Sequence, residues 1–152
     1  MTVAYFRRLY NHGRWADERI LGLFEKSAPP EALKLQTHII SAQAIWLVRL
    51  TGGDPASLQP FPESDLAGLT RRSQENHQAW IRFLNGLTDD LIASSISYKN
   101  LKGDPFTTPV WEVLSHLMLH GHYHRGQVMR IMRQAGAQVA ATDFIIYSRE
   151  PA

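Results

Sequence analysis

The residues best suited to chemistry lie in one histidine-rich segment, residues 116–127. Histidine occurs there at positions 116, 120, 122 and 124. An α-helix turns about 100° per residue, so His120 and His124 would point in nearly the same direction, one turn apart. Two imidazoles placed in this way can hold one divalent metal ion. The segment therefore predicts a metal site.

The apolar pattern around these histidines indicates that both rings face the core. His120 and His124 continue a stripe of inward-facing residues at helical spacing. The stripe consists of Val110, Val113, Leu114, Leu117, Gly121, Val128 and Ile131. A buried imidazole without a partner is costly, so each ring needs a hydrogen bond or a metal ion. A lone histidine here would more often be a hydrogen-bonded core residue, whereas the i, i+4 pair favours a metal.

A third ligand should come from another helix, because metal sites in helical bundles draw their ligands from facing helices. His38 is the strongest candidate, since it lies among small and apolar residues in the segment 37–46. His116, one turn before His120, is a weaker candidate and could instead support a ligand or line a pocket. The predicted metal ligands are His38, His120 and His124, and no catalytic side chain is identified.

Other polar and aromatic residues are expected to line a pocket or to support the ligands. These are Asn11, His12, Trp46 and His116. His122 lies about 200° around the helix from His120, so it is expected to face away as a surface histidine. His77 lies in a polar stretch and is expected to be solvated.

Composition narrows the range of functions. The 152 residues include no cysteine, which excludes disulfides, a cysteine nucleophile and thiolate metal ligands. A formal net charge of +2 is too small to indicate a nucleic-acid partner. The chain shows neither a signal-peptide pattern nor an apolar run near the roughly 20 residues of a membrane span. We expect one domain over residues 1–152, located in the cytoplasm, with no membrane partner.

Four long helices are expected to position these residues. Apolar spacing predicts them over about 2–26, 30–50, 64–87 and 108–135. Residues 88–109 are predicted as a long connection with a short hairpin, because residues 96–98 alternate in polarity and residues 102–105 favour a turn. Residues 144–147 are too apolar to be free in solvent and predict a short C-terminal helix. The expected fold class is all-α, an up-down four-helix bundle with one long connection.

Three segments together resemble the DinB-like (DinB/YfiT) family of metalloenzymes. They are the histidine run 116–128, the segment 38–47 and the first-helix segment 10–21, and the resemblance covers nearly the whole chain. It implies a four-helix bundle, often dimeric, with one divalent ion such as zinc, nickel or iron. Matched by motif, the ligands would be His38, His120 and His124.

The resemblance also implies a reaction type. Relatives in this family include S-transferases that use bacillithiol and an isomerase that uses mycothiol. It therefore implies a metal-dependent enzyme that acts on a small-molecule substrate with a low-molecular-weight thiol as co-substrate. A metal-dependent hydrolase is the alternative enzyme, although no glutamate occupies the His-Glu-x-x-His arrangement that would supply its base. A non-catalytic metal-binding stress-response protein is the third interpretation.

Overall fold

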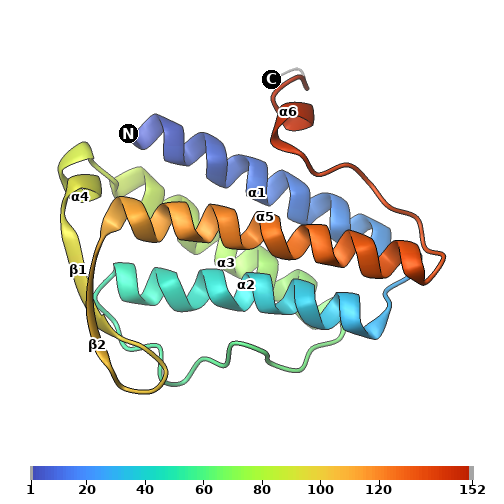
Figure 1. The fold of residues 1–152 in the computed structure, drawn as a ribbon, viewed down its shortest axis with the longest axis horizontal. Helices are drawn as coiled ribbons and strands as arrows, with labels where there is room; N and C mark the ends of the chain where they lie inside the picture. The colour runs from blue at the N-terminus through green and yellow to red at the C-terminus, as the bar shows by residue number, and fades with distance from the viewer. Residues whose placement is uncertain (1, 151–152) are drawn as a thin grey trace.

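The computed structural model describes residues 2–150. The elements, in order, are α1 (Val3–Phe24), α2 (Pro30–Leu50), α3 (Leu66–Gly86), α4 (Asp89–Ala93), β1 (Ser95–Lys99), β2 (Pro105–Pro109), α5 (Val110–Gln134) and α6 (Phe144–Tyr147). Figure 1 shows the four long helices packed side by side, with the β1–β2 hairpin across one end. The predicted all-α class, the hairpin and the short C-terminal helix are confirmed.

Local sequence explains where the long helices begin and end. The side chains of Thr2 and Asp65 cap α1 and α3 by accepting hydrogen bonds from backbone N–H groups of the first turn. Pro30 is the first residue of α2, a position that needs no N–H donor. α5 was predicted to begin near Thr108, but Pro109 still pairs with Ser95 in the hairpin, so the helix begins at Val110.

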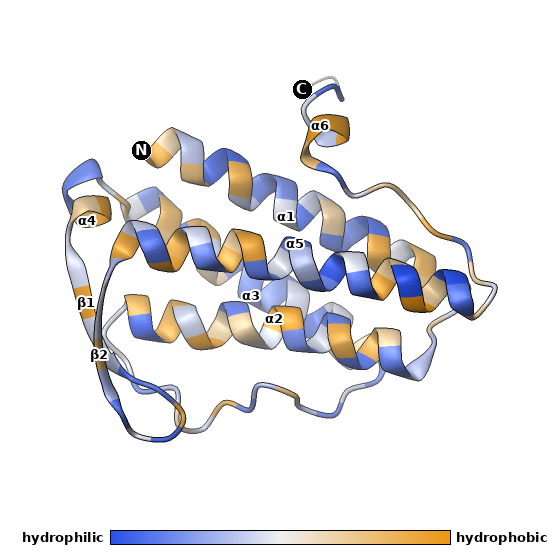
Figure 2. Ribbon diagram, viewed as in Figure 1, coloured by the Kyte–Doolittle hydropathy of each residue, from blue (hydrophilic) through white to orange (hydrophobic). Residues whose placement is uncertain are grey.

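Apolar helix faces meet in two core clusters. The cluster at the hairpin end includes Trp80 and Leu114, and the one at the other end includes Ile39, Leu69 and Val128. Hydrophobic and hydrophilic residues recur along each long helix in Figure 2, as expected for amphipathic helices around a shared core. Within the described residues, no helix is both long and apolar enough to cross a membrane.

The helices α2 and α3 run in the same direction. Residues 51–65 carry the chain back along the length of the bundle, so α3 begins beside the first half of α2 (Figure 1). Three prolines between residues 55 and 62 oppose a tight turn and favour this extended path. The sequence predicted alternating directions with one long connection, and this second long connection is the difference. It lays Pro60 and Phe61 against α2.

Candidate metal centre

The three histidines predicted as ligands come together where α2 packs against α5. One nitrogen from each of His38, His120 and His124 lies within 4.8 Å of the other two. The Nε2 atoms of His38 and His120 are 3.2 Å apart, and the ring centroids of His120 and His124 are 4.4 Å apart. His38 is buried and the other two are half-buried. Two helices therefore present three imidazoles to one point.

The spacing and the chemistry of these donors fit a divalent metal ion. Zinc–nitrogen bonds of about 2.0–2.1 Å at tetrahedral angles place two ligand nitrogens about 3.3 Å apart. The 3.2 Å between the Nε2 atoms of His38 and His120 matches this separation. The group contains imidazoles and no carboxylate, a donor set that suits zinc, nickel, copper or iron.

Hydrogen bonds determine which ring nitrogens are free to bind an ion. Nδ1 of His38 lies 2.7 Å from the carbonyl oxygen of Pro60, and Nδ1 of His124 lies 2.8 Å from Oε1 of Gln127. A carbonyl oxygen only accepts, so each Nδ1 carries the proton and each Nε2 keeps its lone pair. Phe61 stacks on His38 with ring centroids 4.0 Å apart, which further fixes that ring.

Burial favours the neutral form of two of these imidazoles, His120 and His38. The pKa of His120 is lowered to about 4, mainly by burial and then by the neighbouring histidines. The pKa of His38 is also lowered by burial, against an opposing effect of the hydrogen bond to Pro60. Neutral imidazole is the form that binds metal. His38 and His120 are therefore in their metal-binding form at neutral pH.

Of the four residues predicted around the metal, His116 and Trp46 lie beside the cluster. The ring of His116 is 5.4 Å from that of His120, and Trp46 is 5.6 Å from His116. Both lie on the elements that carry the ligands, α5 and α2, towards the hairpin end. These two residues continue the candidate centre along the same face.

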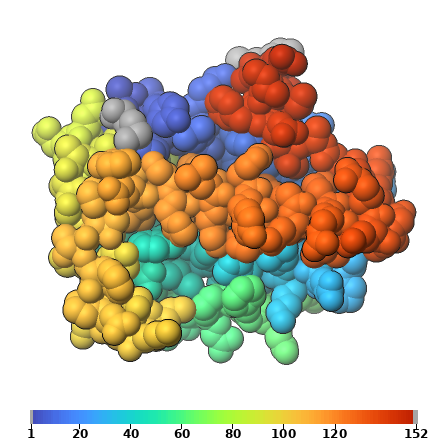
Figure 3. Space-filling view, in the orientation of Figure 1, coloured from blue at the N-terminus to red at the C-terminus, as the bar shows by residue number. Residues whose placement is uncertain are grey.

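The other two predicted residues, His12 and Asn11, belong to α1 and lie elsewhere. His12 is buried, and its Nε2 is 2.8 Å from the carbonyl oxygen of Thr142 in the C-terminal segment. Its ring is 6.5 Å from that of His122, which is exposed as predicted. Asn11 is exposed. The structure does not bring either residue to the three histidines, because α1 packs against the side of α5 that carries His122. Figure 3 shows α5 crossing the middle of one face of the molecule, with the C-terminal segment beside it.

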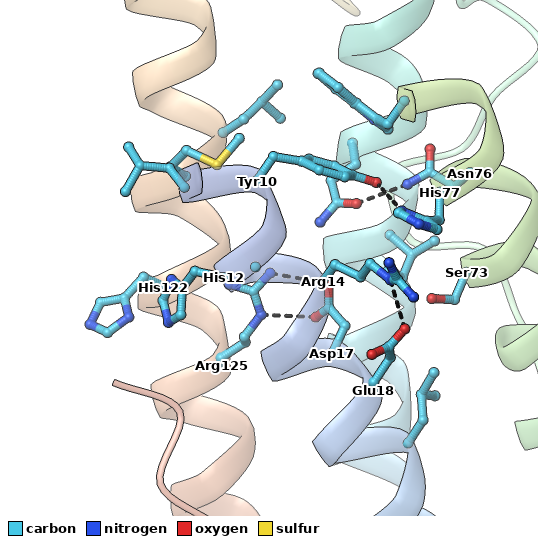
Figure 4. A pocket seen from close by; sticks show the side chains of 18 of the residues that line it. Tyr10, His12, Arg14, Asp17, Glu18, Ser73, Asn76, His77, His122 and Arg125 are labelled. Carbon is cyan, nitrogen blue, oxygen red and sulfur yellow. Dashed lines mark hydrogen bonds and ion pairs between the residues drawn. The ribbon is translucent and has the colours of Figure 1, made fainter. Parts of the chain in front are cut away.

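A second polar assembly, which the sequence analysis missed, lies against α1 and lines a cavity of about 790 Å³ (Figure 4). Arg125 donates from Nε to Oδ1 of Asp17 at 2.8 Å and from Nη2 to Oδ2 at 3.1 Å. Gln36 donates to the same carboxylate at 2.6 Å. A signal was available in Gly13 and Gly121, since a Cβ on either would lie 3.1 or 3.0 Å from the Arg125 guanidinium.

His77, expected to be solvated, also lines this cavity. It is half-buried, and its Nδ1 lies 2.9 Å from the hydroxyl of Tyr10. The two rings stack with centroids 5.7 Å apart (Figure 4). The polar residues of α3 around His77 concealed this inward position, because its buried neighbour Asn76 is itself polar and leaves no apolar pattern.

Fold and cluster together define an all-α protein with a three-histidine group between two helices. The model of the DinB family matches residues 1–151, and the chain belongs to this family. The protein DinB of Bacillus subtilis (strain 168) is 23% identical over 159 residues, covering 92% of this chain and 91% of that protein. A crystal structure of a DinB-like protein from Bacillus cereus ATCC 10987 shares the fold, with a TM-score of 0.70 and 20% identity over 92% of this chain and 97% of that one. The resemblance inferred from the sequence is confirmed.

Proposed function

We propose that this protein is a divalent-metal-dependent enzyme that transfers a low-molecular-weight thiol to an electrophilic small molecule. The observation that carries the proposal is the convergence of three imidazoles on one point, two of them oriented by hydrogen bonds through Nδ1. Three neutral ligands leave the charge of the ion uncompensated and leave coordination positions open, as in catalytic rather than structural sites. When bound, such an ion would lower the pKa of a thiol and favour the thiolate near neutral pH.

The residues of the chain would bind the metal ion, orient its ligand rings and shield the site. Pro60 and Gln127 hold two ligand rings with Nε2 facing the ion, and Phe61 covers one side of His38. The ring of His116 lies 5.4 Å from that of His120, and burial lowers its pKa, so the ring is neutral at pH 7. A neutral imidazole in this position can accept the proton that an incoming thiol loses.

The donor set favours thiol transfer over the hydrolase alternative. Hydrolysis by metal-activated water commonly needs a general base such as a glutamate beside the metal. Gly121 occupies the position after His120 at which the His-Glu-x-x-His arrangement would place this glutamate. A thiol ionises far more readily than water and makes a smaller demand on such a base.

The first experiment is elemental analysis of the purified, tag-free protein beside single-residue variants. We expect about one zinc, nickel or iron ion per chain. His38→Ala, His120→Ala and His124→Ala should each lower metal affinity by well over the 10–100-fold that follows loss of a supporting residue. The exposed His122 is the matched control, and His122→Ala should keep its metal. Equal losses from all four variants, or no metal after reconstitution, would contradict the proposed site.

The second experiment separates the reaction types. The metal-loaded protein is incubated with low-molecular-weight thiols and an aryl halide, and separately with a nitrophenyl ester and no thiol. Thiol-dependent turnover that disappears in His120→Ala supports the proposal. Ester hydrolysis without thiol would favour the hydrolase, and a metal-loaded protein inactive in both assays would favour the non-catalytic interpretation. We also propose that the protein is a homodimer. Light scattering on the same samples measures its molecular mass and tests this.

A further inference from the structure

Arg49, in the last turn of α2, is a buried cation without an acidic partner. It is 7% exposed, and its Nε is sealed from solvent with no hydrogen-bond partner. Among the ion pairs of residues 2–150, none includes Arg49, whereas the other buried arginine, Arg125, is paired with Asp17. Buried charges in folded proteins are normally paired, so Arg49 lacks the anionic partner that is expected for a buried arginine.

Two aromatic rings lie beside the guanidinium, and among residues 2–150 no hydrogen bond from its N–H groups is found. It lies 4.6 Å from the ring centroid of Trp46 and 5.1 Å from that of Tyr98 in β1. Cation–π attraction offsets part of the lost hydration, but ring faces accept no conventional hydrogen bond from the donors that remain. Burial lowers the pKa of Arg49, an effect opposed by Tyr98. Of the guanidinium nitrogens, Nε is the one that is fully sealed without a partner, so Nη1 and Nη2 are the donors that an anion would meet.

Arg49 lies on the same side of α2 as the metal ligand candidate His38. Their separation of eleven residues corresponds to about 20° around the helix and roughly 16 Å along it. Neighbouring rings connect the two places: His116 is 5.4 Å from His120, and Trp46 is 5.6 Å from His116. The guanidinium follows at 4.6 Å from Trp46. A single elongated molecule could therefore contact both.

We propose that Arg49, with Trp46 and Tyr98, forms an anion-binding site that holds a carboxylate or phosphate group of the substrate. The inference that the bound anion is part of the substrate rests on the proposed function. The inference that an anion binds here rests on the unpaired arginine alone. A guanidinium presents parallel N–H donors that match the oxygens of either group. The substrate class is then an elongated anion, with its acidic group up to roughly 16 Å from the atom that reacts at the histidines.

The test measures anion binding by the metal-loaded full chain through tryptophan fluorescence at constant ionic strength. Inorganic phosphate and acetate are titrated separately, which distinguishes the two kinds of oxyanion. Trp46→Phe identifies the part of the signal that arises beside Arg49. We expect saturable binding by the wild type, at least tenfold weaker binding by Arg49→Met, and intermediate binding by Arg49→Lys. Arg133→Met, which removes an exposed arginine from α5, is the matched control and should bind like the wild type.

Metal content and the thermal midpoint are measured for every variant. Unchanged anion affinity in Arg49→Met, or no saturable binding by the wild type, overturns the proposal. Arg49 would then be a structural residue that joins α2 to the hairpin through Tyr98. If Arg49→Met does not fold, Arg49→Lys decides, because it keeps the charge and loses the paired donors: weaker binding supports the proposal and equal binding overturns it. If the wild type takes up no metal after reconstitution, the proposed function is overturned. If that metal-free protein still binds anions through Arg49, the anion site is supported.

Discussion

At the scale of single residues, the clustering of the three histidines could be predicted because their spacing leaves a local pattern. His120 and His124 differ by one helical turn, and His38 stands out among apolar neighbours. Gln127, which orients His124, is also local, only three residues along α5, but other contacts leave no such pattern. The carbonyl of Pro60 acts from a loop 22 residues beyond His38, and the partner of Arg125 lies 108 residues away. Contacts of this kind depend on how the elements pack.

Gln127 should set the metal affinity through His124. In Gln127→Leu, Nδ1 of His124 loses its acceptor, so the ring is no longer held with Nε2 towards the ion. We expect metal affinity to fall about 10–100-fold. Competition with a chelator measures this change. Gln134→Leu alters an exposed glutamine at the end of α5 and should leave the affinity unchanged, whereas equal affinity in both variants would show that the Gln127 contact orients nothing.

His120 should make the metal-free protein sensitive to acid. Its pKa is about 4 in the folded chain and about 6.5 in the unfolded chain, so the unfolded state binds more protons between these values. The free energy of unfolding should therefore fall as the pH drops from about 6.5 towards 4, by at most about 2 kcal/mol at pH 5 from this residue. Urea unfolding of chelator-treated protein at pH 7.5 and pH 5 measures the loss. His120→Gln should lose less over the same interval, and an identical loss would assign the effect to other groups.

At the scale of elements, helix boundaries were more predictable than helix directions. α2 spans the predicted residues because Pro30 begins it and the glycines after Thr51 follow its end. The shared direction of α2 and α3 could not be predicted, since the length and prolines of residues 51–65 are compatible with a return in either direction. That direction matters to the site, because the same connection supplies Pro60 and Phe61 to His38.

Two glycines of α5 should respond oppositely to alanine. A Cβ at Gly121 would lie 3.0 Å from Nη1 of Arg125, and Arg125 cannot give way because Asp17 holds it on two atoms. A Cβ at Gly126 would meet nothing within 4 Å. We expect Gly121→Ala to destabilise the protein by about 1–3 kcal/mol and Gly126→Ala to be neutral or stabilising by up to about 1 kcal/mol. Urea unfolding of both variants measures the difference, and equal effects would mean that the guanidinium has room to move.

At the scale of the whole molecule, the assembly of Asp17, Arg125 and Gln36 joins α1, α5 and α2 between the two apolar clusters. The overall class was predictable from the amphipathic helices and the family resemblance. This buried polar layer was not, because a bundle whose inner positions follow only an apolar pattern would place hydrophobic side chains there. Two members of this layer, Asp17 and Arg125, line the cavity beside α1 (Figure 4).

Removing the acid from this layer should be costly. Asp17→Asn leaves the guanidinium of Arg125 buried without a counter-charge, and we expect a loss of about 3–5 kcal/mol in the free energy of unfolding. Adding Arg125→Met should recover much of it. Glu18→Gln breaks an exposed ion pair with Arg14 one residue along and should cost less than about 1 kcal/mol. Urea unfolding compares the three, and similar losses from Asp17→Asn and Glu18→Gln would contradict the role of burial.

The separation of the ligands along the chain bears on the order of folding. His120 and His124 are one turn apart, whereas His38 lies 82 residues before His120. In an unfolded chain, a metal ion would meet the nearby pair first, and holding residues i and i+4 fixes one helical turn. The first turn is the costly step in forming a helix. An ion present during synthesis would thus nucleate α5, and α2 would dock later onto a helix that the metal had already started.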